Sequence, residues 1–574
     1  MKSPNLFFSQ TLSKIGGMRQ YEGFTTFNVV SGVWVVSNTF VQSQTWNVNG
    51  GTLAGTGTLP AVIVNNGGTL EPGAIGTPGT MTITGNLTFN AGSTYLVQVT
   101  PATSSLAVTG TASLTGGTVN ADFLGTGFVS KQYTILTSTG GLGGTTFAGL
   151  TNTNLPAGST DSLSYNTTTG DNTAYLNLTA GFTQYNNLNG NQQYVANTLT
   201  NYFNSNGGIP AQFFGLSPFG LTQSDGEVAT GAEGSVFGFM NEFLGQISGD
   251  TGSGSGTGTG SSAPGFTAEE HASLPDDVAL AYASILKAQP KPPTFDQRWT
   301  AWGSAFGGAS KTDGNAAAGS NTTSAGAFGV AAGMDYHAAP GTVYGFALAG
   351  GGTNWSVAQN LGSGRSDAFE IGVHGTTHAG PAYLSGALAF ANHWVTTNRT
   401  AALGDQLRAK FDAQSYAARL EGGYRYAVTP TLGFTPYAAL QIQDFHAPSY
   451  SENDLTNGGF GLSYASKSAT DTRSELGARI DDPTLLGTLP LVLRGRVAWA
   501  HDWVSTPSLN AAFQTLPGSS FTVNGAALPK NSALTSAGAD LYLSANWTLS
   551  AKFDGEFATG SQTYAGTGTL RYSW

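Results

Sequence analysis

The chain has 574 residues, and its 22 basic and 33 acidic side chains give a formal net charge of −11. Only 10% of the residues are charged and 81 are glycine, which argues against a charge-rich helical bundle and favours β-structure with many turns. The acidic balance argues against a nucleic-acid partner, because such proteins bind phosphates through basic side chains. The absence of cysteine excludes disulfides and thiolate chemistry.

Residues 1–30 form an atypical N-terminus without a clear signal peptide. The opening MKSPNLFFSQ carries one lysine and an apolar run too short for the central region of a secretory signal. No stretch of the sequence approaches the roughly 18 consecutive apolar residues of a membrane helix. A membrane location would therefore require a closed β-barrel.

Residues 31–182 are rich in threonine, glycine, asparagine and valine, and short motifs recur along them. Asn49–Leu53 and Asn66–Leu70 both have the sequence NGGTL, and looser relatives follow at 90–94 and 115–119. A short β-turn unit repeated in this way predicts a stacked β-solenoid (β-helix). A β-sandwich with irregular turns is the alternative.

Residues 183–248 change to helical spacing and predict a helical junction region. Residues 249–266 contain TGSGSGTGTGSS, which is typical of a flexible linker. Residues 267–293 predict another helix, with Asp276 and Asp277 at its N-terminal end and Lys287 near its C-terminal end, as the helix dipole favours.

From residue 294 to 574, long segments alternate between apolar and polar positions. Leu549, Ala551 and Phe553 share one face, for example, and Ser550, Lys552 and Asp554 share the other. The alternation predicts twelve strands, at about 298–309, 323–337, 342–355, 366–378, 382–396, 409–427, 432–446, 471–481, 490–503, 533–546, 548–558 and 562–574. Long polar loops are expected near 309–322, 355–366, 397–408, 447–470 and 504–532, with short turns between them. Charges on one face, aromatic ends on the other and alternating loop lengths are typical of an outer-membrane barrel, and a soluble sandwich is the alternative.

Two groups of residues in this region are candidate functional positions. By strand parity, the charges expected to face the lumen are Arg419, Glu421, Arg425, Arg494, Arg496, Lys552 and Asp554. Leu570, Tyr572 and Trp574 lie on the apolar face of the last strand, which ends on a bare tryptophan.

A solenoid, a linker, a helix and a twelve-stranded barrel ending in Tyr-x-Trp resemble the classical autotransporters, the type Va secretion proteins. The resemblance covers about 45–574, and its most specific parts are Trp299–Gly308 (WTAWGSAFGG), Asn49–Leu59 (NGGTLAGTGTL) and the terminal aromatic residue. It implies an all-β monomer: a β-helical passenger displayed at the cell surface, a helix at 267–293 inside the lumen and a transmembrane barrel at 294–574 in the bacterial outer membrane.

The resemblance also implies partners. These are the outer-membrane lipid bilayer, periplasmic chaperones and the barrel assembly machinery, which in this family recognises the terminal aromatic strand, here Leu570, Tyr572 and Trp574. Adhesion to a surface ligand follows by analogy only.

No catalytic site, metal site or cofactor is predicted, and the chain is not expected to be an enzyme. His501 and Asp502 are adjacent in a strand and therefore point to opposite faces. His374 and His378 are too far apart along a strand to make a good metal pair, and Asp276 and Asp277 fit helix N-terminal charges. A pore or channel-like barrel is the alternative function, with a passenger enzyme as a third.

Overall fold

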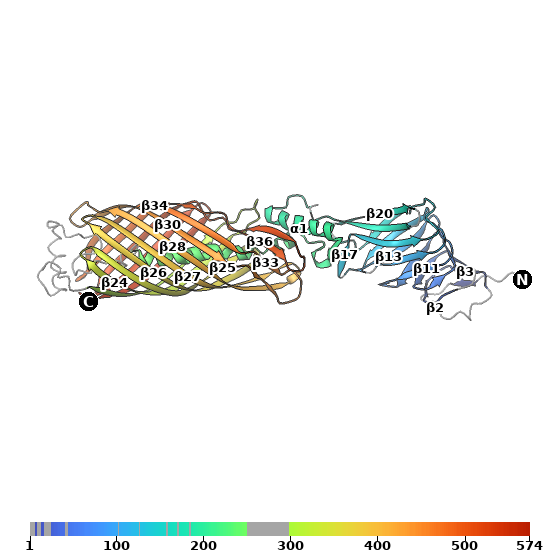
Figure 1. Ribbon diagram of the computed structural model, residues 1–574, viewed down its shortest axis with the longest axis horizontal. Helices are drawn as coiled ribbons and strands as arrows, with labels where there is room; N and C mark the ends of the chain where they lie inside the picture. The colour runs from blue at the N-terminus through green and yellow to red at the C-terminus, as the bar shows by residue number, and fades with distance from the viewer. Residues whose placement is uncertain are drawn as a thin grey trace. The chain divides into compact units, whose positions relative to one another are not determined.

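A computed structural model describes residues 24–40, 44–101, 103–125, 127–156, 159–168, 171–182, 185–248 and 298–574, with the short strands β1 (Leu6–Phe8) and β2 (Ser13–Ile15). The chain divides into two compact units (Figure 1): unit 1 comprises Met1–Leu188 and Val195–Phe219, and unit 2 comprises Asn189–Tyr194 and Gly220–Trp574. The predicted linker at 249–266 and the predicted helix at 267–293 lie outside the described residues. Among the described helices, none has the length and apolar character needed to cross a bilayer.

Unit 1 is built mainly from three sheets of mostly parallel strands, and β17 pairs separately with the short strand β22 (Gly208–Pro210). The orders of the three sheets are β1-β3-β5-β8-β12-β15, β19-β16-β13-β9-β6-β4-β2 and β20-β21-β18-β14-β11-β7, with β10 beside β9. The strands are β3 (Thr26–Val29), β4 (Val33–Val36), β5 (Thr45–Val48), β6 (Gly51–Gly55), β7 (Thr58–Leu59), β8 (Ala61–Val64), β9 (Gly68–Ala74), β10 (Thr77–Pro78), β11 (Thr80–Ile83), β12 (Leu87–Phe89), β13 (Ser93–Val99), β14 (Ser105–Val108), β15 (Ala112–Ser113), β16 (Gly117–Phe123), β17 (Phe128–Ser130), β18 (Gln132–Ser138), β19 (Gly149–Thr153), β20 (Ser159–Thr168) and β21 (Asp171–Ala180).

The repeats noticed in the sequence stack on one another. Leu53 of the first NGGTL motif pairs in register with Leu70 of the second, and Leu70 pairs with Tyr95 on the next turn of the solenoid. All three side chains are fully buried in the solenoid interior. The predicted β-helix is therefore confirmed, and its described strands begin at Leu6 with β1, before the expected boundary at residue 31.

Helices connect the solenoid to the barrel. They are α1 (Gly190–Asn206), the 3-10 turn η2 (Ala211–Phe213), α2 (Pro218–Ser224), the 3-10 turn η3 (Glu227–Thr230) and α3 (Gly231–Ile247), with the short strand β22 (Gly208–Pro210) between α1 and η2. A reciprocal cap starts α1, since the Asn189 side chain accepts from the Gln192 amide and the Gln192 side chain accepts from the Asn189 amide.

Unit 2 contains a sheet of 14 strands in which β28 also pairs with β30, so the sheet closes on itself. Two of its members, β29 (Tyr426–Ala427) and β32 (Asn453–Asp454), are short additions, and the remaining twelve form an antiparallel barrel. The twelve strands are β23 (Trp299–Thr312), β24 (Thr323–Ala339), β25 (Thr342–Val357), β26 (Gly362–Ala379), β27 (Ala382–Thr400), β28 (Gln406–Tyr424), β30 (Gly433–Ala447), β34 (Lys467–Leu486), β35 (Leu489–Trp503), β38 (Asn531–Tyr542), β39 (Trp547–Ala558) and β40 (Ser561–Ser573). The predicted twelve-stranded barrel is confirmed.

The outer wall of the barrel is apolar and carries aromatic side chains near both ends. Trp299, Trp547 and Tyr572 are exposed near the end where tight turns connect the strands, called here the turn end. Trp394, Trp499 and Trp503 are exposed toward the opposite end, called here the loop end. An apolar band flanked by two aromatic belts is the surface of a barrel that faces lipid.

Two loops at the loop end are shorter than the sequence suggested. The expected loops at 355–366 and 397–408 are largely strand, because β25 continues to Val357 and β27 to Thr400. The two longest loops instead form a small sheet in the order β31-β33-β36-β37, made of β31 (Tyr450–Ser451), β33 (Leu462–Tyr464), β36 (Ser508–Phe513) and β37 (Ser520–Asn524). Strands of two to six residues contain too few alternating positions for the sequence pattern to predict them.

The inside and outside of β39 can be tested with one substitution. Phe553 is 56% exposed on the outer wall, so Phe553→Arg should lower the stability of the barrel in lipid by about 2–4 kcal/mol. The control Phe553→Leu keeps an apolar side chain in contact with lipid and should lower the stability of the barrel much less. Urea unfolding in lipid vesicles measures both, and an arginine variant as stable as the leucine variant would mean that Phe553 does not face lipid.

Candidate functional site: the barrel lumen and its helix

Helix α3 lies inside the barrel. Its apolar residues Phe239, Met240, Phe243, Leu244 and Ile247 pack on a wall of small residues from β24–β28, with Trp302 and Phe306 of β23 beside them. The wall contributes Ala331, Ala347, Ala349, Ala368, Ala387, Ala389, Ala391 and Ala417. Small side chains let the helix approach closely; at Gly372, an added Cβ would lie 2.6 Å from Ile247 Cδ1. Seventeen helical residues span about 26 Å, close to the height of the apolar band of such barrels.

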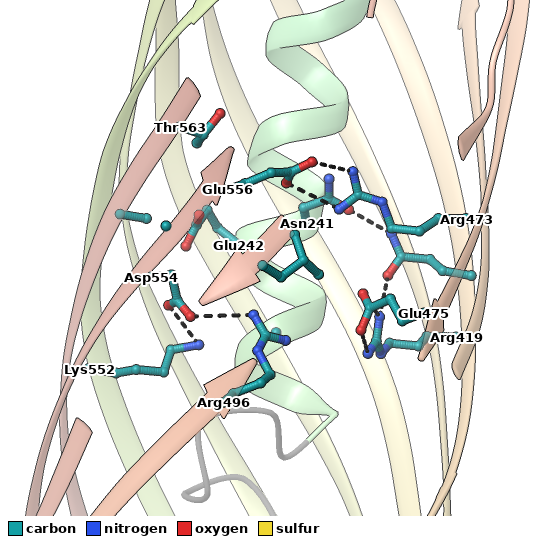
Figure 2. A pocket seen from close by; sticks show the side chains of 15 residues that line it. Asn241, Glu242, Arg419, Arg473, Glu475, Arg496, Lys552, Asp554, Glu556 and Thr563 are labelled. Atoms are coloured by element: carbon teal, nitrogen blue, oxygen red, sulfur yellow. Dashed lines mark hydrogen bonds and ion pairs between the residues drawn. The ribbon is translucent and has the colours of Figure 1, made fainter. Parts of the chain in front are cut away.

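The other side of α3 is polar and faces the wall formed by β30, β34, β35, β39 and β40. Figure 2 shows Asn241 and Glu242 directed toward charged side chains of that wall. The side-chain oxygen Oδ1 of Asn241 accepts hydrogen bonds from the side-chain amides of Gln441, at 2.6 Å, and Gln443, both on β30. Nearer the turn end, Gln246 accepts a hydrogen bond from Ser304 of β23. These bonds fix both the rotation and the depth of the helix.

Ion pairs line the polar wall (Figure 2). Arg473 binds Glu556 at 2.8 Å and Arg419 binds Glu475 at 2.9 Å. Arg473 also binds Asp502 on the adjacent strand β35 at 2.6 Å. Opposite charges thus lie within hydrogen-bond distance, both on adjacent strands and across intervening ones, which compensates for removing them from bulk water. A cavity of about 90 Å³ lies between these pairs and Asn241, and a second of about 180 Å³ lies nearer the loop end beside Gly231, Gly234 and Gly238 of α3.

All seven charges selected from the sequence point inward. Arg419 and Glu421 pair at 2.9 Å, and Arg425 pairs with Asp481 at 2.8 Å. Arg494 pairs with Asp540 at 2.6 Å. Asp554 pairs with Arg496 at 3.6 Å and with Lys552 at 2.8 Å. In contrast, Leu570, Tyr572 and Trp574 are exposed on the outer wall, and Trp574 exchanges two backbone hydrogen bonds with Trp299 at the turn end.

A polar collar surrounds the chain where it enters the barrel at the loop end. The collar consists of Asn321, Trp355, Arg399, Glu452 and Tyr464. The side chains of the first three and of Tyr464 bind residues 223–228, and Glu452 binds Arg399 and Tyr464. Arg399 donates to the Gln223 carbonyl at 3.0 Å, Tyr464 to the Gly226 carbonyl at 3.3 Å and Trp355 to the Val228 carbonyl at 2.9 Å. Arg399 also forms a two-bond pair with Glu452, with both distances 2.7 Å and both side chains 1% exposed.

Glu227 is the titratable group of the entering segment that the collar binds most directly. Its carboxylate accepts from both the backbone and the side-chain amide of Asn321, each at 2.5 Å. Burial raises the pKa of Glu227 to about 7, and the two bonds from Asn321 oppose this rise by favouring the charged form. The segment is therefore bound through backbone carbonyls and one buried carboxylate, contacts that depend on the position of the chain more than on side-chain identity.

Sequence reasoning missed several members of this site. Glu556 shares the strand parity of Lys552 and Asp554 on β39, so parity alone could have found it. Arg473 and Glu475 share one face of β34, within the predicted strand at 471–481, and the same reasoning could have been applied to them. Arg399 and Glu452 lay in expected loops, where parity gives no information. Helix α3 was expected as part of the junction region, and the lumenal position was assigned to 267–293, which lies outside the described residues.

The histidines considered as metal ligands have other partners. His374 lies 3.1 Å from Asp335, and His378 Nδ1 lies 3.2 Å from the Gly341 carbonyl. Asp502 points inward to Arg473, whereas His501 lies beside Asn531 at a surface-exposed position. Within the described ranges, no group of three or more histidine or acidic side chains is arranged to hold a metal ion.

A closed twelve-stranded barrel with an apolar exterior, a charged interior and a helix in its lumen defines an outer-membrane β-barrel protein. Residues 301–554 match the protein family described as "Autotransporter beta-domain". Unit 2 is therefore the membrane domain of an autotransporter, and the resemblance seen in the sequence is confirmed.

Individual relatives are distant. Two extracellular serine proteases of Serratia marcescens are 24% and 23% identical to this chain over 200 residues, which is 34% of this chain and 19% of each relative. The translocator domain of the autotransporter NalP from Neisseria meningitidis is similar at 13% identity, covering 51% of this chain and 92% of that domain with a TM-score of 0.40. The beta domain of the Bordetella autotransporter Brka gives 17% identity, 48% and 100% coverage and a TM-score of 0.38.

The buried pair in the collar gives a sharp prediction. Arg399→Leu leaves the Glu452 carboxylate buried without its cation, so the variant should lose about 3–5 kcal/mol of stability. The double variant Arg399→Leu/Glu452→Leu should recover most of that loss, and Arg408→Leu, at an exposed position on neighbouring β28, should cost little. Thermal unfolding in detergent measures all three, and equal losses for Arg399→Leu and Arg408→Leu would contradict the buried pair.

Proposed function

We propose that the chain is an outer-membrane autotransporter that displays unit 1 at the cell surface, with α3 remaining in the barrel after passage. The observation that carries this proposal is the direction of α3. Its first residues lie at the collar, and its end lies near the turn end, where the Ser248 carbonyl accepts a hydrogen bond from Ser385. A chain emerging at the loop end would thus connect the solenoid to the barrel through the lumen.

The alternative, an open channel, is less well supported by the lumen. Helix α3 fills one side of the barrel, and the collar holds the segment before it. Two cavities beside α3 in the described part of the lumen have volumes of about 90 and 180 Å³. The helix and the barrel wall together therefore block the pore and keep the membrane sealed.

Within this proposal, unit 1 acts by binding. Although distant relatives are named serine proteases, the first histidine of this chain is His271, so the solenoid has no histidine to serve as the base of a Ser-His-Asp triad. Its repeated strands instead form long regular surfaces, which supports adhesion as the role of the displayed unit.

Display can be tested in a Gram-negative host with a supplied signal peptide. Protease added to intact cells should remove unit 1 and leave a protected, heat-modifiable barrel fragment in the outer membrane. As a control, protease is added to the same cells after their outer membrane has been lysed. The additional unit 1 that is then digested measures how much of it had remained in the periplasm. Solenoid that is cut only after lysis, with barrel present in the outer membrane, would contradict the proposal.

The terminal aromatic face gives a second prediction. Trp574→Asp places a charge on the outer wall at the turn end and should strongly reduce the amount of barrel in the outer membrane, whereas Trp574→Phe should be tolerated. Gln562→Asp, exposed near the other end of the same strand, is the matched control. Quantitative blotting of outer membranes measures the three variants. Wild-type levels of Trp574→Asp would show that the aromatic residue is not an assembly signal.

A further inference from the structure

One face of the solenoid is made almost entirely of hydroxyl and amide side chains. The hydroxyl face, as we call it, consists of the outward-pointing residues of β11, β14, β18, β21 and β20, five neighbouring strands of one sheet, with the residues that directly follow β11, β14 and β18. Threonine dominates it, and from Asn172 onward in β21 and at the described positions of the other four strands it carries no charge and no aliphatic side chain larger than alanine. Neighbouring strands lie about 4.8 Å apart, so the hydroxyls form regular rows.

The hydrogen bonds on this face hold its side chains in fixed positions. Thr109 donates to the Thr84 carbonyl at 2.7 Å, and Thr139 donates to the Thr109 carbonyl at 2.9 Å. Each of these hydroxyls thereby uses its single proton on the protein itself. The oxygen lone pairs that point away from the sheet are left as acceptors, in positions that need no further ordering when a ligand binds.

Amides on the same face are also fixed by their neighbours. Gln132 donates from its side chain to Asn177 at 2.8 Å, and Asn177 donates to Ser164 at 2.8 Å. Tyr175 lies between these positions and the threonine rows, partly exposed, and offers an apolar ring with a polar tip. Rows of fixed acceptors beside one aromatic ring suit a ligand that carries many hydroxyl donors and some apolar C–H surface.

Charge further restricts the choice of ligand. Residues 24–182 contain one lysine and four acidic residues, so their net charge is 1 − 4 = −3. Of the five, only Asp171, the first residue of β21, shares the strand parity of the hydroxyl face, and it stands at the end of that strand. A polyanion would find no basic partner on the face, and a polycation would find no row of acidic ones. We propose that the hydroxyl face binds an uncharged polysaccharide.

This inference rests on the proposed display of unit 1 and names its partner class. The test uses the full chain, refolded in detergent, so that a failure of export cannot mimic a failure of binding. Electrophoresis in native gels containing amylose, dextran, mannan or hydroxyethyl cellulose measures retardation by neutral polymers, with alginate and chitosan as charged comparisons.

The decisive variant is Thr80→Val/Thr82→Val/Thr137→Val, which removes three hydroxyls from the hydroxyl face and keeps the shape and strand preference of each residue. Its matched control is Thr94→Val/Thr118→Val/Thr151→Val on the second sheet of the same solenoid. We expect at least one neutral polymer to retard the protein, with affinity about tenfold weaker for the first variant and unchanged for the control.

Three results would overturn the inference. They are no retardation by any neutral polymer, equal retardation of both triple variants, and stronger retardation by alginate or chitosan than by the neutral polymers. If the refolded chain forms dimers and the first variant does not, the occupant of the hydroxyl face is a second copy of this chain. That result would also overturn the proposal that the face binds a polysaccharide.

Discussion

Pairing of the first barrel strand with the last is the interaction on which the rest of unit 2 depends. Thr300 of β23 and Ser573 of β40 are 273 residues apart in sequence, and their side-chain oxygens lie 2.9 Å apart. In hydrocarbon, an unpaired strand edge would leave its backbone groups without any partner, so only closure makes the sheet compatible with lipid. Closure also creates the lumen, and the lumen in turn gives α3 a wall to pack against.

Once the barrel is closed, its two inner walls impose different requirements on the helix. The alanine-rich wall accepts Phe239, Phe243 and Ile247, so apolar burial holds the helix on that side. The charged wall pairs many of its own members, such as Arg473 with Glu556. The helix faces it with polar side chains that include Asn241 and Glu233, which lies 4.0 Å from Lys467. This division explains how one helix can be tightly packed on one side and border cavities on the other. The collar adds contacts to backbone carbonyls, which fix where the chain enters.

The barrel could be predicted from sequence because its signal repeats twelve times: Phe553 outward and Lys552 inward are one instance of an alternation that lipid and lumen enforce on every strand. The solenoid could be predicted because NGGTL recurs. The lumenal role of α3 could not, because Phe239 and Phe243 have the spacing of any buried helix and nothing in that spacing specifies an alanine wall more than sixty residues away. The Arg399–Glu452 pair was missed for a similar reason, since the end of β27 and the long loop after β30 meet only in the folded barrel.

The central claim is that α3 occupies the lumen, and cross-linking tests it most directly because the chain has no cysteine of its own. Gln246 and Ser304, hydrogen bonded across the helix–wall contact, would be replaced by cysteines and joined by a short thiol-specific reagent in outer-membrane preparations. A specific protease site placed in Thr251–Ser262 then separates the helix from the barrel in denaturant unless the two are linked. The account predicts joined fragments for this pair and separate fragments for the control pair Gln246→Cys/Leu549→Cys, whose second position lies on the outer wall. Separate fragments from both pairs, or equal joining in both, would contradict it.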